Sequence, residues 1–296
     1  KCICSCERIL FSVQPIALIP LFPSHSLFND SNVFIFPEQG CGVEASPNLI
    51  HHSPWVVYLE YWRDNFKTDI RCTATLIDDQ HLVTAAHCMT PKFTRLVARL
   101  GEYDLTKEVD CLNGICSEPA LRLDVIDVII NPNYDGRAHD IAVLKLAEKV
   151  PYTDYNHLIF LADFIRPVCL PTGVLEPKAT LVASGWGEIP RRGVYSSIKK
   201  IIPLPIWEQK ACVAAYKHFR VPAHVICAGG VEGVDTCRGD SGGPLVWIRE
   251  RIEFWGVTSA GNVKCGTKNS PGLYTNVADH LEWILNVVEH FGYEAF

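Results

Sequence analysis

One stretch near the C-terminal end decides how the whole chain is interpreted, and it runs Asp235-Thr236-Cys237-Arg238-Gly239-Asp240-Ser241-Gly242-Gly243-Pro244-Leu245. Ser241 stands between Gly239 and the Gly242-Gly243 pair. Glycines carry no side-chain bulk, so backbone N–H groups can approach a reacting oxygen closely. A serine hydroxyl is a weak nucleophile unless a base activates it and a third group orients that base. The stretch therefore predicts a nucleophile in a glycine-lined turn.

Two upstream motifs supply the base and the orienting group. His87 lies in Thr84-Ala85-Ala86-His87-Cys88, and Asp140 opens the apolar run Asp140-Ile141-Ala142-Val143-Leu144. Imidazole titrates near neutral pH and suits proton transfer. Isolated serines, histidines and aspartates are mostly surface or capping residues, but three such motifs in the order His, Asp, Ser are very unlikely to arise by chance. We predict that His87, Asp140 and Ser241 are catalytic.

These motifs and their order resemble the trypsin- and chymotrypsin-like serine peptidase family, over roughly Cys41 to the C-terminus. The resemblance implies an all-β fold of two antiparallel six-stranded β-barrels with a C-terminal helix packed on the second barrel. It also implies acyl-enzyme catalysis, in which Ser241 attacks the peptide carbonyl, His87 transfers the proton and Asp140 holds the histidine tautomer.

The same resemblance assigns roles to residues around the serine. Gly239 and Ser241 would form the oxyanion hole. Asp235 would lie at the base of the primary specificity pocket, where a buried carboxylate favours an arginine or lysine side chain. The alternative, that Asp235 is an ordinary turn residue, is disfavoured by the flanking cysteines. The other substrate-binding residues would be Ser259 beside the triad aspartate and the small wall residues Gly261 and Gly272.

Length and composition agree with one folded domain over residues 41–296. The chain has 296 residues, of which 48 % are hydrophobic and 20 % charged, with a net charge of −6. This is the balance of an ordinary soluble protein, and no basic patch indicates nucleic-acid binding. The apolar run from Ile9 to Phe22 is too short to span a bilayer, so no membrane association is expected.

The 13 cysteines indicate an oxidising, extracellular compartment, where disulfides persist. A zinc site is disfavoured because the C-terminal cysteines lack paired ligand spacing. Cys111 and Cys116 flank a short Asn-Gly loop and could close a small ring. Three cysteines, Cys2, Cys4 and Cys6, stay unassigned, which leaves an intermolecular bond, a free thiol or missing sequence open. By resemblance the other pairs are Cys41–Cys169, Cys72–Cys88, Cys212–Cys227 and Cys237–Cys265.

Residues 1–40 differ from the rest of the chain. The apolar segment after Arg8 has the rough shape of a secretory signal, but Pro15 and Pro20 interrupt any helix. A disordered extension is the favoured alternative. Cys41-Gly42 resembles the tether of arthropod clip-domain peptidases, and the chain is closest in style to that group of the family. Only three cysteines precede it, so no complete clip domain is expected.

Short alternating segments at regular spacing predict β-barrel strands and not a parallel sheet. Val277 to Val288 carries apolar residues at helical spacing and predicts an amphipathic C-terminal helix. The predicted strands are 54–61, 72–77, 81–84, 96–100, 121–130, 141–146, 179–187, 201–205, 225–228, 244–248 and 254–259.

The loop from Glu102 to Asp110 gathers carboxylates, which are the ligands that calcium prefers. By resemblance this loop could hold that ion, but a solvated acidic loop is the favoured alternative. No other cofactor is expected.

Three departures from the family pattern bear on activity. Ala260 replaces a tryptophan that lines the next substrate pocket, and Thr73 replaces a glycine. The third is the activation site, because family zymogens are cut after Arg or Lys and the new amino group pairs with the aspartate before the serine. Here that aspartate is Asp240, and no Lys or Arg lies between Arg8 and Arg63. Burying Asp240 without a partner would cost roughly 3–5 kcal/mol. A missing exon, a different activation route and an inactive chain remain open, and the missing exon is favoured.

Together these features predict a secreted serine endopeptidase that cleaves after Arg or Lys, in an extracellular proteolytic cascade such as arthropod clotting or melanisation. Its partners would be a protein or peptide substrate, an upstream protease and a serpin-type inhibitor. The alternative is a catalytically silent homologue that binds partners as a cascade cofactor. The intact Ser241 argues against that alternative, and the missing activation site argues for it.

Overall fold

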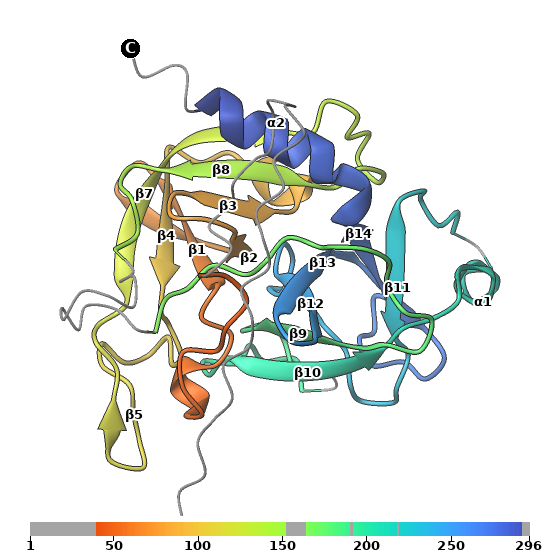
Figure 1. Ribbon diagram of the computed structural model, residues 1–296, viewed down its shortest axis with the longest axis horizontal. Helices are drawn as coiled ribbons and strands as arrows, with labels where there is room; N and C mark the ends of the chain where they lie inside the picture. The colour runs from red at the N-terminus through yellow and green to blue at the C-terminus, as the bar shows by residue number, and fades with distance from the viewer. Residues whose placement is uncertain (1–39, 152–163, 190–191, 218, 292–296) are drawn as a thin grey trace, which may run out of the picture. The chain divides into compact units, whose positions relative to one another are not determined.

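The computed structural model describes residues 40–151, 164–189, 192–217 and 219–291. The expectations for residues 1–39, including the signal-like segment and the three unassigned cysteines, lie outside this part of the chain. Two antiparallel sheets make up most of the described structure (Figure 1). None of the described helices is long and apolar enough to cross a membrane.

The first sheet closes into a six-stranded antiparallel barrel in the order β1-β2-β3-β8-β7-β4. Its strands alternate apolar side chains inward, and Leu59, Leu82 and Leu144 are fully buried in its core. All six strands overlap segments predicted from the alternating pattern, although β2 begins six residues earlier than expected. The bounds are β1 Val56–Arg63, β2 Phe66–Leu76, β3 His81–Thr84, β4 Arg95–Leu100, β7 Leu121–Ile130 and β8 Ala142–Leu146.

The second sheet has six strands in the order β10-β9-β12-β13-β14-β11 and curls until its edges approach. The edge strands meet at an isolated bridge between Ile206 and Ala228 instead of a continuous ladder. Pro203 and Pro205 in β10 lack the N–H that a ladder needs, which keeps this strand at the edge. The bounds are β9 Thr180–Gly185, β10 Lys200–Pro205, β11 Val225–Gly229, β12 Pro244–Ile248, β13 Ile252–Ala260 and β14 Pro271–Asn276.

The all-β prediction with two six-stranded sheets and a C-terminal helix is confirmed. The helix position is corrected. Helix α2, Leu281–Phe291, lies along β8 of the first barrel and not on the second (Figure 1). Its buried residues Ile284 and Val287 belong to the core cluster that contains the first barrel, and the Phe291 ring stacks on His81.

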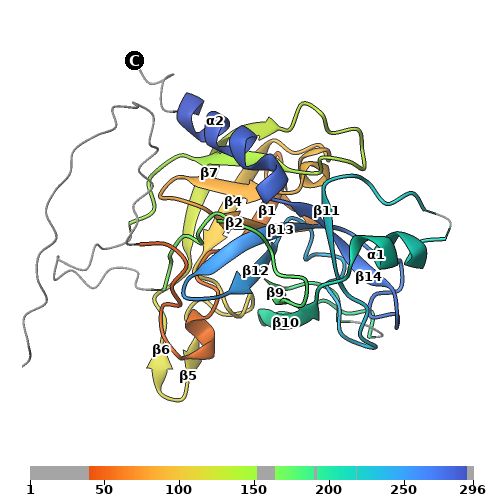
Figure 2. The same cartoon turned by 45° about the vertical axis from the view of Figure 1, so that its right-hand side comes forward.

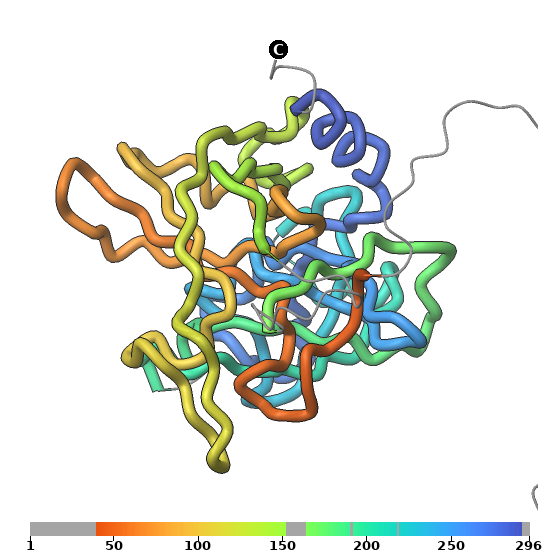
Figure 3. Tube along the Cα trace, turned by 60° about the vertical axis from the view of Figure 1, so that its left-hand side comes forward, coloured from red at the N-terminus to blue at the C-terminus, as the bar shows by residue number. Residues whose placement is uncertain are grey.

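Smaller elements complete the structure. Helix α1, Gln209–Ala215, was not predicted. Strands β5, Cys111–Leu112, and β6, Ile115–Cys116, form a hairpin that projects from the body (Figures 2 and 3). Three 3₁₀ turns are η1 Leu49–His51, η2 Ala86–Met89 and η3 Ala278–His280.

The described residues contain five disulfides, and they join the pairs that the resemblance and the Asn-Gly loop indicated. One of them, Cys72–Cys88, fixes the turn that carries His87 to strand β2. Cys41–Cys169 spans 128 residues and ties the start of the described chain to the second half. The remaining bonds are Cys111–Cys116, Cys212–Cys227 and Cys237–Cys265.

Candidate active site

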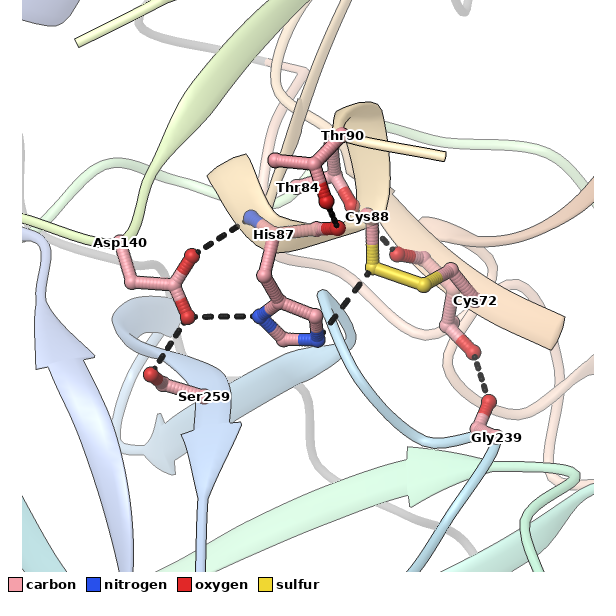
Figure 4. The surroundings of a disulfide bond; sticks show 9 residues. Cys72, Thr84, His87, Cys88, Thr90, Asp140, Gly239 and Ser259 are labelled. Atoms are coloured by element: carbon pink, nitrogen blue, oxygen red, sulfur yellow. Dashed lines mark hydrogen bonds and ion pairs between the residues drawn. A yellow bond between two sulfur atoms is a disulfide. The ribbon is translucent and has the colours of Figure 1, made fainter. Parts of the chain in front are cut away.

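Strand pairing in the first barrel brings the predicted base and its orienting group together. Strands β3 and β8 are antiparallel neighbours, with Thr84 opposite Ala142. His87 lies in η2, three residues beyond the end of β3, and Asp140 lies two residues before the start of β8. Because the end of one strand meets the start of the other, their side chains lie at the same edge of the barrel. Figure 4 shows the His87 ring between Asp140 and the Cys72–Cys88 disulfide.

Three hydrogen bonds fix the Asp140 carboxylate, which is buried. His87 Nδ1 lies 2.7 Å from Oδ2, and the His87 backbone N–H donates to Oδ1 at 2.8 Å. Ser259 Oγ donates to Oδ2 at 2.6 Å (Figure 4). A carboxylate only accepts, so Nδ1 carries the proton and Nε2 is left with its lone pair. This tautomer is the one that a general base acting through Nε2 requires.

Ser241 lies in the turn that leads into β12. Thr73 N–H donates to Ser241 O at 2.8 Å, which ties the turn to strand β2. Gly242 has a φ of +79°, and a Cβ at this position would collide with Thr84 Oγ1 and Thr73 O. The turn can therefore approach the first barrel this closely only with glycine after the serine.

The structure joins two of the three predicted catalytic residues by a direct hydrogen bond. Within the described residues, Ser241 Oγ makes no hydrogen bond to His87, and His87 Nε2 lies 3.8 Å from Cys88 Sγ. Such bonds are often long without substrate and tighten when it binds. Ser241 does share a cavity with Ser259, the residue that donates to Asp140.

That cavity has a volume of about 230 Å³ and contains every residue to which the resemblance gave a substrate-binding role. Its walls bring together the segment of residues 235–241 that precedes β12, the end of β13 with the loop after it, and the start of β14. The lining residues that matter here are Asp235, Ser241, Ser259, Gly261 and Gly272.

The Asp235 side chain is buried in this cavity with only 6 % of the residue exposed. Its Oδ2 accepts from Gly266 N–H at 2.9 Å, whereas Oδ1 has no hydrogen-bond partner among the described residues. Burial raises the pKa of the Asp235 carboxyl to about 6. A buried carboxylate oxygen without a partner is unfavourable, and a cationic guest would relieve this.

Thr73, which replaces a glycine of the family pattern, contacts the turn that carries Ser241. The residue is fully buried, and Thr73 Oγ1 donates to Gly239 O at 3.2 Å. Gly239 has a φ of +95° and is the residue whose N–H is predicted to face the oxyanion. Thr73 therefore helps to hold the predicted oxyanion-hole backbone, a role that sequence reasoning missed.

Asp240 is buried behind the serine turn, with 3 % of the residue exposed. Its carboxylate accepts from Gly187 N–H at 2.7 Å and from Cys237 N–H at 2.9 Å. A Cβ at Gly187 would collide with this carboxylate, so glycine makes the room for it. In the described part of the chain no cation forms an ion pair with Asp240, and burial raises its pKa to about 6.

Replacing Asp240 with asparagine is expected to flatten the pH dependence of stability. The folded state binds the Asp240 proton more tightly than the unfolded chain does. The contribution of Asp240 to the free energy of unfolding therefore falls as pH rises from about 4 through about 6, and is constant above that. Between pH 4 and pH 7.5 the free energy of unfolding of the wild type should fall by about 2 kcal/mol more than that of Asp240→Asn. Urea unfolding with intact disulfides, at a series of pH values, measures the free energy of unfolding of the two proteins. Equal pH dependence would show that a cation pairs with Asp240.

The acidic loop is only partly solvated, because Glu108 is exposed whereas its three other carboxylates are buried. Glu102, Asp104 and Asp110 are all buried. The Arg99 guanidinium contacts Glu102, and Lys107 Nζ lies 3.3 Å from Asp104. The positive charges of Arg99 and Lys107 therefore already compensate part of the carboxylate charge that a calcium ion would balance. Calcium binding, the less favoured alternative for this loop, stays a hypothesis.

One further cluster has metal-ligand chemistry, namely His87 with Cys72 and Cys88. Thiolates are the form of cysteine that binds metal ions, but both sulfurs here are consumed by their disulfide. The cluster therefore does not offer a metal site.

Comparison with known proteins places this geometry in a family. The family model named Trypsin matches residues 42–284. The chain belongs to the trypsin family of serine proteases. This trypsin-family chain is 34 % identical over 278 residues to Serine protease 7 of Drosophila melanogaster, covering 84 % of the chain and 67 % of that protein. It is 35 % identical over 280 residues to the Phenoloxidase-activating enzyme of Bombyx mori, covering 83 % and 60 %.

A solved structure of a related protease agrees with the trypsin-family fold. Mouse neuropsin, a serine protease expressed in the limbic system of the brain, superposes with a TM-score of 0.66 at 26 % identity. The match covers 84 % of this chain and 99 % of neuropsin. By contrast, the chain spans 60 to 67 % of the length of the insect relatives named above.

Proposed function

We propose that this chain is a serine endopeptidase that hydrolyses peptide bonds after arginine or lysine. One observation supports this proposal above the others. Asp235 is buried, has one carboxylate oxygen without a partner in the described part of the chain, and lines the same cavity as Ser241. An arginine or lysine side chain that enters the cavity would bring its charge to that oxygen and its backbone carbonyl near the serine hydroxyl.

The proposed reaction has two halves. Ser241 Oγ attacks the carbonyl carbon while His87 Nε2 takes its proton, and Asp140 stabilises the imidazolium that forms. The N–H groups of Gly239 and Ser241 bind the oxyanion, each contributing on the order of a hundredfold or more in rate. His87 then gives the proton to the leaving amine. Water then attacks the acyl-enzyme with His87 again as the base, which releases the acid product and restores the Ser241 hydroxyl.

The setting of this reaction is also a proposal. Five disulfides in the described residues support secretion, because such bonds persist in oxidising compartments. One relative is named Phenoloxidase-activating enzyme and another CLIP domain-containing serine protease B10 of Anopheles gambiae. We propose an extracellular cascade in which an upstream protease and a serpin-type inhibitor act on this chain.

Specificity can be tested with matched fluorogenic peptides that differ only in arginine, lysine or phenylalanine before the scissile bond. The ratio of kcat/KM for arginine over phenylalanine is expected to exceed about 100 at pH 8. It should fall as pH drops through about 6, because protonation of Asp235 removes the charge that arginine pairs with. A ratio near one at all pH values would contradict the proposed pocket.

The environment of Asp240 favours a second candidate, a silent homologue that binds partners. Asp240 is buried with two backbone donors and no ion-pair partner among the described residues. If the oxyanion hole does not assemble under these conditions, the chain would bind substrate-like peptides without turnover. Binding of an arginine peptide by isothermal titration, together with absent hydrolysis in the same sample, would identify this candidate.

A further inference from the structure

A second cavity, here called the Arg71 cavity, lies beside the turn that carries Ser241. It has a volume of about 400 Å³, and none of its described lining residues belongs to the cavity that contains Asp235. Tyr195 lines the Arg71 cavity, and a Cβ at Gly239 would lie 3.2 Å from the Tyr195 ring. The Arg71 cavity therefore reaches the backbone that is proposed to bind the oxyanion, from outside the proposed specificity pocket.

Strand β2 leads from this cavity to the Ser241 turn, and one of its edges is open. Thr73 N–H donates to Ser241 O at 2.8 Å, so the backbone of Thr73 faces away from β1. The direction of backbone N–H and C=O groups alternates along a strand, so those of Arg71 face the same way as those of Thr73. Within the described residues β3 pairs with β2 only at Thr75 and Leu76, which leaves the edge at Arg71 without a neighbouring strand.

The part of a substrate that follows the scissile bond would fit this open edge. With an arginine or lysine side chain beside Asp235, the chain after the scissile bond would leave Ser241 where Gly239 meets Tyr195. It would then run antiparallel to β2, because β2 approaches Ser241 from Arg71. An exposed strand edge can bind an extended peptide in this way, through its backbone groups. This step rests on the proposed function, which places the scissile carbonyl at Ser241.

Strand geometry then fixes which substrate residue lies opposite Arg71. Arg71 precedes Thr73 by two residues, a distance of about 6.6–6.8 Å along the strand. The second residue after the scissile bond would therefore lie opposite Arg71. Directly opposed residues of an antiparallel pair have side chains on the same face, with Cβ atoms about 4.5–5.5 Å apart.

Arg71 gives the cavity a positive charge that the chain does not neutralise. Its guanidinium lies over the Tyr195 ring, 4.4 Å from the ring centroid, and it forms no ion pair within the described part of the chain. Stacking uses the face of the guanidinium and leaves its N–H edge for a carboxylate. The other two lining cations differ, because Lys67 and Arg99 both pair with the buried Glu60.

We propose that Arg71 is a specificity-determining residue that selects substrates with an aspartate or glutamate at the second position after the scissile bond. A carboxylate there can accept two N–H groups of the guanidinium at once. Asp69 is the one carboxylate among the described lining residues, and it is exposed. Its negative charge repels a second carboxylate, so Asp69→Asn is expected to strengthen the selection.

The test uses three peptides that have the same arginine before the scissile bond and differ only at the second position after it. That position holds glutamate, glutamine or lysine, and chromatography of the products gives kcat/KM for each peptide. We expect kcat/KM to be about three- to tenfold higher for glutamate than for glutamine at low salt, and lowest for lysine. The ratio of glutamate to glutamine should shrink as the salt concentration rises, because the pair is partly exposed.

Three variants assign the selection to one side chain. Arg71→Gln should bring the ratio of glutamate to glutamine close to one, and Arg71→Glu should make lysine the preferred residue. Arg122→Gln is the matched control, since Arg122 is an exposed arginine of the same barrel that does not line the cavity. It should leave the ratio within a factor of about two. A glutamate preference that survives Arg71→Gln and is lost in Lys67→Gln would overturn the assignment to Arg71.

The outcomes separate this inference from the proposed function. Equal hydrolysis of all three peptides would overturn the role of Arg71 and leave cleavage after arginine intact. If none of the peptides is hydrolysed, their binding to the Ser241→Ala chain is measured by isothermal titration. Tighter binding of the glutamate peptide that Arg71→Gln abolishes would support the site in a silent homologue. Equal binding of the three peptides, or no binding to the folded chain, would overturn it.

Discussion

Replacing Asp140 with asparagine is expected to lower kcat for an arginine substrate by about 10⁴-fold while KM changes little. The carboxylate accepts from His87 Nδ1, the His87 backbone N–H and Ser259 Oγ, and an asparagine amide cannot accept from all three. Its NH₂ group facing Nδ1 would favour the tautomer with a proton on Nε2. That tautomer cannot take the proton of Ser241.

The matched control is Asp127→Asn, an exposed carboxylate on β7 in the same barrel. It should leave kcat within a factor of two. Circular dichroism and urea unfolding of both variants show whether folding is intact. A folded Asp140→Asn variant with nearly normal kcat would contradict the role assigned to the His87–Asp140 pair.

The second large effect is expected from Asp235→Ser. Removing the carboxylate removes the charge partner of the arginine or lysine side chain. Breaking a buried ion pair by removing one partner costs about 3–5 kcal/mol. We therefore expect kcat/KM for arginine and lysine substrates to fall at least about a hundredfold. Hydrolysis of the phenylalanine substrate should be unchanged or faster, because no charge is buried beneath the apolar ring.

Asn262→Ser serves as the control for this change, since Asn262 lines the same cavity without bearing a charge. It should leave the ratio of arginine to phenylalanine hydrolysis nearly unchanged. If Asp235→Ser loses activity equally on all substrates, the residue supports the fold of the pocket and does not select the substrate.

Much of the fold could be predicted because barrel strands alternate with period two and turns carry glycine, proline and polar residues. Strand β14 was missed because it opens with Pro271 and Gly272, which weaken a strand pattern. Helix α1 was missed because its seven residues show too little periodicity. The apolar stripe of α2 was predicted to be buried. Such a stripe does not show which barrel covers it, and the assignment to the second barrel was wrong.

Site residues carried by short motifs were accessible from the sequence, whereas those that depend on spatial neighbours were not. The hydroxyl of Thr73 contacts Gly239, 166 positions away, and no local pattern predicts that contact. The acidic loop was expected to be solvated because nothing in it shows that Arg99 folds back over Glu102. Arg71 and Tyr195 are far apart in the sequence, so their contact is visible only in the folded chain.

The central claim is that Ser241 is an activated nucleophile in this chain. A serine-directed phosphonate with an arginine-like side chain tests it, with the adduct located by peptide mass spectrometry and Ser241→Ala as the control. We predict one adduct per chain, located on Ser241. A folded chain that forms no adduct, or forms it equally in Ser241→Ala, would contradict the claim and favour the silent homologue.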